Sequence, residues 1–293
     1  MRALVYLIFS MATLGTLAPT ARAASLLPIR TEDARALPHG HAEAVLGIDY
    51  FKDLRFPDFT PSGSISSQDL YSLPRIGLNF GLGDWVEVQA SYELLYLDET
   101  LGYGGGSDTK YGSGDARLFT KVYLLAEHDW WPAAGVRFGA KLPNANVDDR
   151  LGTDEIDFMI EALATKDLGA MTVHLNLGLA LLDNPGPTAP PPPTTSPFSS
   201  DGQDDLFTWS VAGASHPFDV GNGISFQLLA EFAGREGSRF DNDRDVFRGG
   251  LQLGYGAWHF YAGASAGLIT ASENVGATTG LIYDFEPGTW FKR

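Results

Sequence analysis

The sequence predicts an all-β protein, a closed antiparallel transmembrane β-barrel of about 12 strands with short periplasmic turns and longer external loops. Three observations predict this fold class. Apolar and polar residues alternate with a period of two along much of the chain, as half-apolar strands require. The connections between these stretches alternate in length, and a leader-like stretch opens the chain. The 34 glycines and the 12% of aromatic residues also favour turns and strands over helices.

Residues 1–23 have the three parts of a signal peptide. Arg2 supplies the basic start, residues 3–17 form an apolar run, and an A-x-A motif precedes Ala24. We expect cleavage before Ala24. The alternative is a membrane-anchoring helix, for which the apolar run is short. Residues 24–40 show no sustained period, and we interpret them as an N-terminal segment on the periplasmic side.

The barrel is expected over residues 41–285, where the alternation recurs from stretch to stretch. The predicted strands are 43–51, 75–82, 86–94, 115–124, 133–142, 156–165, 171–181, 207–213, 224–235, 247–255, 258–268 and 278–285. Gly83 and Asp84 favour a tight turn between the second and third strands. Strands of about ten residues, tilted by about 40°, match the height of the apolar band of an outer-membrane barrel.

The lengths of the connections distinguish a barrel from a soluble sandwich, whose strands also alternate. Long connections follow the first, third, fifth and seventh predicted strands, and short ones follow the second, fourth and sixth. This is the habit of transmembrane barrels, and an even strand number places both termini on the periplasmic side. Large aromatic residues at or beside the short turns fit an interfacial girdle, and these are Trp85, Trp130, Trp131, Phe218 and Trp258.

The stretch TTGLIYDF at 278–285 resembles the closing-strand signal of bacterial outer-membrane barrels. Thr278, Gly280, Tyr283 and Phe285 occupy its polar, glycine and aromatic positions. The alternative is an ordinary edge strand of a soluble sandwich. If the signal operates, Phe285 pairs beside the first strand, and the barrel-assembly machinery is a partner through this stretch. Residues 286–293 then form a C-terminal extension outside the sheet.

Short motifs spread over most of the mature chain resemble one bacterial family. In chain order they are Thr31-Glu32-Asp33 with Leu37-Pro38 and Gly40, Gly112-Ser113-Gly114-Asp115, Lys141-Leu142-Pro143, Leu151-Gly152-Thr153, Thr165-Lys166-Asp167-Leu168-Gly169 and His174-Leu175-Asn176-Leu177-Gly178. This series is similar to the outer-membrane transporters named for the meta-pathway of phenol degradation. The resemblance implies an outer-membrane barrel that passes small, often aromatic or hydrophobic compounds. The proline-rich stretch 186–197 and the C-terminal extension depart from the family pattern.

Ionisable residues gather on the faces that we assign to the lumen. Four successive strands carry acids, bases, bases and acids in turn, which predicts a ladder of cross-strand pairs. The expected pore-lining residues are Glu87, Glu93, Arg117, Lys121, Arg137, Lys141, Asp157, Glu161 and His174. One interpretation is that mutually satisfied charges fill the interior. The other is a pore whose basic wall favours anionic solutes.

Charge and composition argue against several kinds of partner and site. The formal charge is −16, and it becomes −18 once Arg2 and Arg22 leave with the signal peptide, so we expect no nucleic-acid partner. The chain has no cysteine, which excludes disulfides and Cys-based sites. We expect no cofactor and no metal. His39 and His41 beside Glu43 form a weak metal-binding pattern that chance also produces.

We therefore predict an outer-membrane channel or transporter for the passive uptake or efflux of small organic molecules, and not an enzyme. Its expected surroundings are outer-membrane lipid and lipopolysaccharide. The alternative is a non-conducting structural or adhesive barrel with a closed, charged interior. A third hypothesis, a lipid-acting enzyme, needs His, Ser and a carboxylate together near the membrane surface, and the six histidines suggest no obvious triad.

Overall fold

The computed structural model describes residues 25–54, 65–101, 106–146, 148–149, 151–182, 205–237, 243–270 and 272–290. The expected signal peptide and the proline-rich stretch 186–197 lie outside these ranges. In the described part of the chain one 14-stranded sheet forms. The strands of the barrel wall are β1 (Ala42–Lys52), β2 (Ile65–Gly83), β3 (Val86–Leu101), β5 (Ala116–Leu125), β6 (Ala133–Leu142), β7 (Asp157–Asp167), β8 (Met171–Leu181), β9 (Leu206–Ser215), β11 (Ile224–Glu236), β12 (Arg244–Tyr255), β13 (Trp258–Gly267) and β14 (Val275–Phe285).

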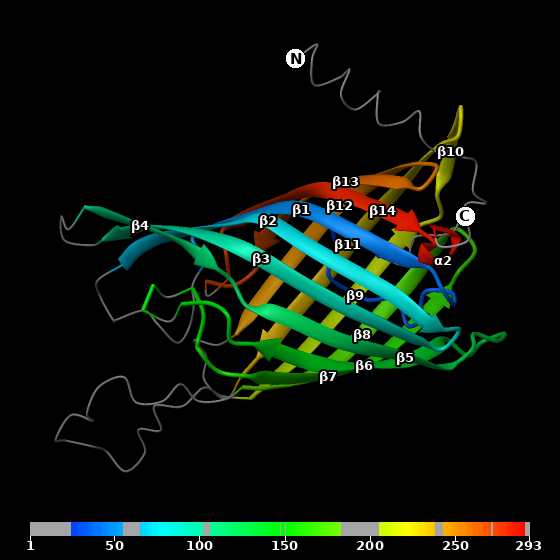
Figure 1. The fold of residues 1–293 in the computed structure, drawn as a ribbon, viewed down its shortest axis with the longest axis horizontal. Coiled ribbons are helices and arrows are strands. Elements are labelled where there is room, and N and C mark those ends of the chain that lie inside the picture. Colours follow the sequence, from blue (N-terminus) through cyan, green and yellow to red (C-terminus); the bar gives the residue numbers. More distant parts are fainter. Residues whose placement is uncertain are drawn as a thin grey trace.

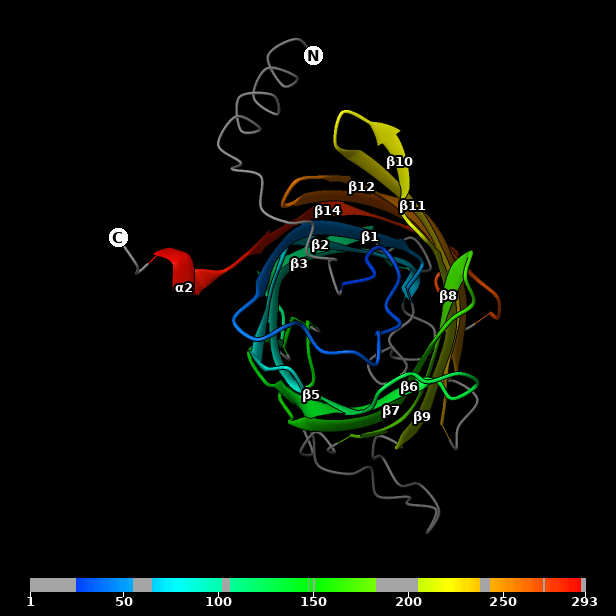
Figure 2. The same ribbon diagram turned by 90° about the vertical axis from the view of Figure 1, so that its right-hand side faces the viewer.

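The wall closes on itself. Its strands pair antiparallel in chain order, β9 pairs with β11, and β14 pairs with β1. In the closing pair Ala42 lies opposite Phe285, and Lys52 lies opposite Val275. The end-on view shows the resulting ring (Figure 2). Closure satisfies the backbone N–H and C=O groups that lipid cannot pair, and it confirms the predicted 12-strand barrel and the partner of the closing strand.

Two further strands lie off the wall and change the predicted boundaries. β4 (Ser107–Ser113) pairs with β3, although the sequence predicts a long connection at 97–112. β10 (Phe218–Gly221) forms a small hairpin with the start of β11. Cross-strand aromatic contacts support the extension of β2 and β3, because the Tyr71 and Tyr96 rings lie 5.6 Å apart. In Figure 1, β2, β3 and β4 project beyond the neighbouring strands.

The outward face of the wall is apolar. Along β8, Leu175 and Leu177 are exposed, whereas Asn176 between them is buried. Aromatic residues border the apolar face at the short turns, where the Trp130 and Trp131 rings stack 4.2 Å apart. An apolar band with aromatic edges is the surface that hydrocarbon and its interface require.

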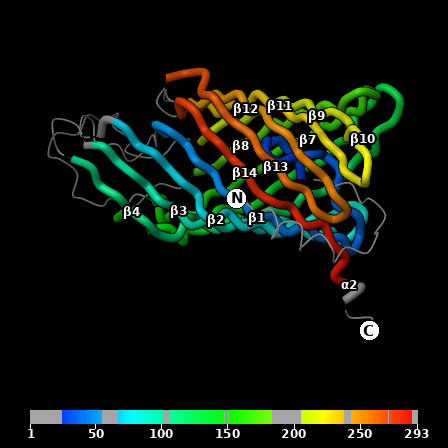
Figure 3. Tube along the Cα trace, turned by 90° about the horizontal axis from the view of Figure 1, so that it is seen from above, coloured from blue at the N-terminus to red at the C-terminus, as the bar shows by residue number. Residues whose placement is uncertain are grey.

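Beyond β14, α2 (Pro287–Trp290) lies outside the sheet, near the C-terminal end of the tube in Figure 3. Figure 3 also shows the strands running obliquely to the long axis of the molecule, as closure of a barrel requires. Within the described residues, no helix is both long enough and apolar enough to cross a membrane.

Candidate functional site

A loop of chain occupies part of the lumen. Residues 25–41, here called the luminal loop, precede β1 and run inside the ring in Figure 2. At one end Ser25 Oγ donates a hydrogen bond to the Glu43 carboxylate near the start of β1. At the other end the N–H of Gly40 donates to Gly81 O, 2.9 Å away near the end of β2. Both ends of the loop therefore lie beside the short turns.

The apex of the luminal loop is at Arg30 and Thr31. Their backbone N–H groups donate to Glu231 Oε2 at 2.9 and 2.8 Å. The Arg30 guanidinium donates to Asp49 Oδ2 at 2.8 Å. Because Asp49 and Glu231 lie well inside β1 and β11, the loop reaches the middle of the wall.

Glycines on the inner face of the wall make room for the loop. A Cβ atom on Gly263 would lie 2.5 Å from Pro28 Cγ, and one on Gly135 would lie 2.8 Å from Ala34 O. Real Cβ atoms do not approach other atoms so closely, so the absence of a side chain at these positions is what lets the loop pack. These two inward glycines of the alternating pattern thus have a packing role.

Small apolar clusters hold the loop against the wall. Ile29 is buried with Ala212 and Leu229, and Ala34 is buried with Leu163. Burying a side chain of the size of isoleucine stabilises a fold by about 2 kcal/mol. The luminal loop is therefore bound by hydrophobic contacts as well as by charges.

The predicted ladder of charges exists in the register of the wall. Glu87 lies opposite Lys121, Lys121 opposite Arg137, and Arg137 opposite Glu161. At the two ends of this row, Lys121 Nζ is 3.1 Å from Glu87 Oε2, and Arg137 Nη1 donates to Glu161 Oε2 at 2.7 Å. The two bases in the middle of the row repel each other unless an anion joins them.

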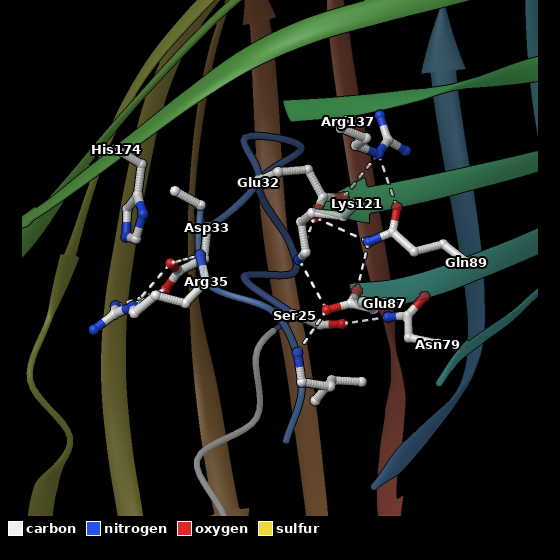
Figure 4. A network of polar contacts seen from close by, with 12 residues as sticks. Ser25, Glu32, Asp33, Arg35, Asn79, Glu87, Gln89, Lys121, Arg137 and His174 are labelled. Carbon is white, nitrogen blue, oxygen red and sulfur yellow. Dashed lines mark hydrogen bonds and ion pairs between the residues drawn. The ribbon is translucent and has the colours of Figure 1, made fainter. Parts of the chain in front are cut away.

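Glu32 of the luminal loop supplies that anion. Its carboxylate is 3.3 Å from Lys121 Nζ and 3.9 Å from Arg137 Nε, and Figure 4 shows it reaching toward both residues. Removal from water raises the pKa of the Glu32 carboxyl, but Lys121 and then Arg137 more than offset this effect, so that the pKa lies below its ordinary value. In the orientation that gives both of its polar atoms a partner, the side-chain amide of Asn176 binds the Glu32 backbone. Its oxygen then accepts a hydrogen bond from Glu32 N at 2.9 Å.

A second row of charges lies nearer the long connections. Arg117 lies opposite Lys141, and Lys141 lies opposite Asp157. Arg117 Nη1 donates to Glu93 Oε1 at 2.8 Å, and Lys141 Nζ is 2.7 Å from both Asp157 Oδ2 and Thr153 Oγ1. This row therefore ties the wall to the connection between β6 and β7.

That connection folds back over the inner face. Asp115 Oδ1 accepts hydrogen bonds from the backbone N–H groups of Asn144 and Ala145, each at 3.0 Å. Leu151 joins a buried apolar cluster with Leu97. The sequence motifs around Asp115, Lys141 and Leu151 thus meet at one place, where they hold this connection against β3 and β5.

His174 links the luminal loop to two strands of the wall. Thr165 Oγ1 accepts from the backbone N–H of Ala34 at 2.9 Å and lies 2.9 Å from His174 Nδ1. Which of the two groups donates is set by the tautomer of the imidazole, because a hydroxyl both donates and accepts. His174, on the strand after Thr165, is only 1% exposed, so its position is structural.

The expected pore-lining residues all lie on the inner face, but they differ in exposure. The side chains of Lys121 and Glu87 are 1% exposed, whereas those of Arg117 and Glu161 are 39% and 22% exposed. Pairing and the luminal loop cover the first two. That the set lines an open pore stays a prediction.

Sequence reasoning missed several residues that organise the lumen. Asp49 and Glu231 fall on the inner face of predicted strands, and this parity is the signal that could have found them. Arg30 belongs to a stretch without any period, so no pattern marked it. Arg248, which donates to Glu231 Oε1 at 2.6 Å, also shares the inner parity of its strand.

A cavity of about 150 Å³ remains beside the apex of the luminal loop. Its wall residues come from β7, β8, β9 and β11, and Arg30 comes from the loop. The lining residues are Arg30, Glu161, Asn176, Thr208, Trp209, Ser210, Ala233 and Gly234. A cavity of roughly this volume holds a molecule of the size of benzene.

A closed wall, an apolar band on its outside and paired charges on its inside define a transmembrane β-barrel of the outer-membrane class. Solved structures support this class. The chain is similar to the crystal structure of an outer membrane channel from Pseudomonas putida F1, with 18% identity, a TM-score of 0.62, and coverage of 88% of this chain and 100% of that one.

Two further structures share the fold. The translocator domain of the autotransporter NalP from Neisseria meningitidis has 12% identity, coverage of 97% of each chain and a TM-score of 0.50. The beta domain of the Bordetella autotransporter BrkA has 13% identity, coverage of 84% of this chain and 99% of that one, and a TM-score of 0.51. No protein-family model and no curated protein sequence matches the chain. The fold and the apolar exterior place the protein in the bacterial outer membrane.

Proposed function

We propose that the protein is a passive outer-membrane channel for the uptake or efflux of small organic molecules. The observation that carries this proposal is the cavity beside the apex of the luminal loop. The loop takes up part of the lumen at mid-height and leaves a space of about 150 Å³ between Arg30 and the wall of β7, β8 and β9. A solute that crosses the barrel would pass there. The similar Pseudomonas putida protein is described as an outer membrane channel, which supports the proposal at the level of the fold.

The size and the lining of the cavity suggest the class of solute. A space of about 150 Å³ suits small molecules, in agreement with the family that the sequence motifs resemble. The lining includes two hydroxyls, an amide and two charged groups, so we infer that permeating molecules carry polar groups beside any apolar part. An aromatic or hydrophobic body belongs to the proposal through the resemblance alone.

Conductance in planar lipid bilayers tests the proposal. We expect the purified, folded barrel to give discrete openings, and liposomes that contain it to swell in solutions of small organic solutes. Folding is checked by the shift in gel mobility between unheated and heated samples, and the heated sample is the control. A correctly folded barrel that never opens and passes no solute would overturn the channel.

One observation favours a second candidate, a closed structural barrel. Lys121 and Glu87 form an ion pair in which both side chains are 1% exposed, as in a filled interior. The two candidates differ in the effect of replacing Arg137 and Lys141 by glutamine. In a channel the double variant changes ion selectivity, whereas in a closed barrel it changes mainly stability.

We infer no enzymatic role for the lumen. His174 contacts Thr165, and His216 Nε2 lies 3.1 Å from Asp167 Oδ1 beside a short turn, so these two histidines have roles in packing and in a turn. Incubation of the folded barrel with phospholipid and with lipopolysaccharide checks this inference. We expect no release of fatty acid above that of a heated control, and release would contradict it.

A further inference from the structure

We propose that the cavity beside Arg30 is a binding subsite for small zwitterionic solutes, which carry a carboxylate and an ammonium group a few atoms apart. The inference rests on the proposed channel function and names the class of solute that the narrow part of the lumen recognises. Three observations support the inference: two charged groups in the cavity are accessible, both have unused hydrogen-bonding capacity, and they belong to clusters of opposite net charge.

The accessible charges in the cavity are one cation and one anion. The side chain of Arg30 is 37% exposed and that of Glu161 is 22% exposed, and both line the cavity. The neighbouring charged side chains Asp49 and Lys121 are each 1% exposed. The charged side chains that line the cavity are therefore Arg30 and Glu161. Glu32 and Arg137, whose side chains are 24% and 18% exposed, lie outside its lining.

Both accessible groups have capacity left for a ligand. Arg30 uses Nη2 for Asp49, and a guanidinium carries five N–H donors in a planar fork that matches a carboxylate. Glu161 uses Oε2 for Arg137, and within the described residues its Oε1 atom has no hydrogen-bond donor. An ammonium group can donate to Oε1 while a carboxylate accepts from Arg30.

The two groups belong to clusters of opposite net charge. Arg30 and Arg75 share the single carboxylate of Asp49, at 2.8 and 3.0 Å, so this cluster carries one excess positive charge. The other cluster contains two cations and three carboxylates and carries one excess negative charge. Its members are Lys121, Arg137, Glu32, Glu87 and Glu161.

A cavity lined by one member of each cluster lies in a field directed from one to the other. A singly charged anion is attracted by Arg30 but repelled by Glu161. A singly charged cation is attracted by Glu161 but repelled by Arg30. A neutral solute gains little from either group. A zwitterion satisfies both at once, so the arrangement selects it by attraction and rejects singly charged solutes by repulsion.

The uncharged part of the lining suits the body of such a solute. Thr208 and Ser210 of β9 lie on the inner face with Asn176 of β8. Hydroxyls both donate and accept, so they can replace the water that a small polar solute loses. The volume limits the solute to roughly six to eight non-hydrogen atoms, by comparison with cavities that hold benzene.

Binding and permeation of four size-matched probes test the proposal. The probes are 4-aminobutanoate, butanoate, butylammonium and butanamide. Saturation-transfer NMR on the detergent-solubilised, full mature barrel measures binding, and liposome swelling measures permeation. We expect 4-aminobutanoate to bind most tightly and to permeate fastest relative to its diffusion in water.

Two variants locate the subsite. Arg30→Gln lies on the luminal loop and Glu161→Gln lies on the wall, so loss of the loop cannot explain both. We expect each to weaken 4-aminobutanoate binding by about tenfold, the loss that goes with one charge-assisted contact of about 1.4 kcal/mol. Lys52→Gln is the matched control, because Lys52 is exposed at the outer end of β1.

The outcomes separate this inference from the channel itself. A barrel that conducts but binds and passes all four probes alike overturns the subsite and leaves the channel standing. A barrel that binds 4-aminobutanoate through Arg30 and Glu161 but never conducts supports the subsite and overturns the channel. Equal effects of Lys52→Gln and Arg30→Gln would also contradict the subsite.

Discussion

The two sides of the lumen differ in how their polar groups are satisfied. On the side of β3, β5 and β6, the wall charges pair with one another and with Glu32, and Lys121 is 1% exposed. On the side of β8 and β9, Thr208 and Ser210 face a cavity of about 150 Å³. Both sides have the same alternation of apolar and polar residues. The alternation of apolar and polar residues therefore determines which side chains face the lumen, whereas the luminal loop determines which of these side chains are shielded from water.

Deletion of residues 25–38 should abolish the difference between the two sides of the lumen, and it has the largest expected effect. Without the luminal loop both sides of the lumen face water, so we expect single-channel conductance to rise several-fold. Lys121 and Arg137 lose Glu32, and the ion selectivity should shift toward anions. Planar-bilayer recordings measure both changes. A deletion variant with unchanged conductance would show that the loop does not obstruct the lumen.

Glu87→Gln tests the covered side alone. It leaves Lys121, which is 1% exposed, with Glu32 as its remaining anionic partner. Breaking a buried pair in this way costs about 3 kcal/mol of unfolding free energy. Unfolding in urea, followed by tryptophan fluorescence, measures the change. The control is Glu236→Gln at the exposed end of β11, for which we expect a change within about 0.5 kcal/mol.

Gly263→Ala tests the fit between the loop and the wall. Its Cβ would lie 2.5 Å from Pro28 Cγ, whereas a Cβ on Gly249 would meet no atom nearer than 3.7 Å. The chain has no cysteine, so Leu37→Cys, at a position 1% exposed, reports the position of the loop through maleimide labelling. We expect several-fold faster labelling with Gly263→Ala and no change with Gly249→Ala. Equal rates in the two backgrounds would contradict the packing role of Gly263.

Acidification gives the smallest effect and sharpens the role of Glu32. Burial raises the pKa values of Glu32 and Asp33, but their basic partners bring both below the ordinary values of 4.5 and 3.8. Groups with lowered pKa values stabilise the packed state above their ordinary pKa, and this stabilisation is lost as the pH falls toward the lowered one. Because maleimide reacts with the thiolate, labelling of Leu37→Cys is expressed at each pH relative to that of the unfolded variant. We expect this ratio to stay constant from neutral pH down to about 4.5 and to rise below it. Glu32→Gln should label faster at neutral pH and depend less on pH.

The sequence was sufficient for the wall because strand pairing follows from period-two patterning. The partner of Phe285 and the row from Glu87 to Glu161 both follow from parity and from antiparallel order. β4 was not predictable in the same way, because SDTKYGS is polar on both faces. In its register with β3, Tyr111 lies opposite Tyr96.

The luminal loop could not be predicted from patterning for a different reason. Much of its attachment uses backbone N–H groups, as where Arg30, Thr31 and Leu37 donate to wall carboxylates, and such bonds leave no period in the side chains. The motifs that resemble the bacterial transporter family did contain this information. Glu32, Thr165 and Asn176 all belong to those motifs, and all hold the loop. Their shared role in holding the luminal loop becomes evident only in the folded barrel.

The two ends of the luminal loop lie beside the same mouth of the barrel, at Ser25 with Glu43 and at Gly40 with Gly81. Over the described residues the luminal loop therefore enters the lumen and returns through the same mouth. Such a loop can be inserted after β1 and β14 have paired, or withdrawn while they stay paired, without breaking the hydrogen bonds between these two strands. Assembly of the wall and filling of the lumen are topologically independent steps.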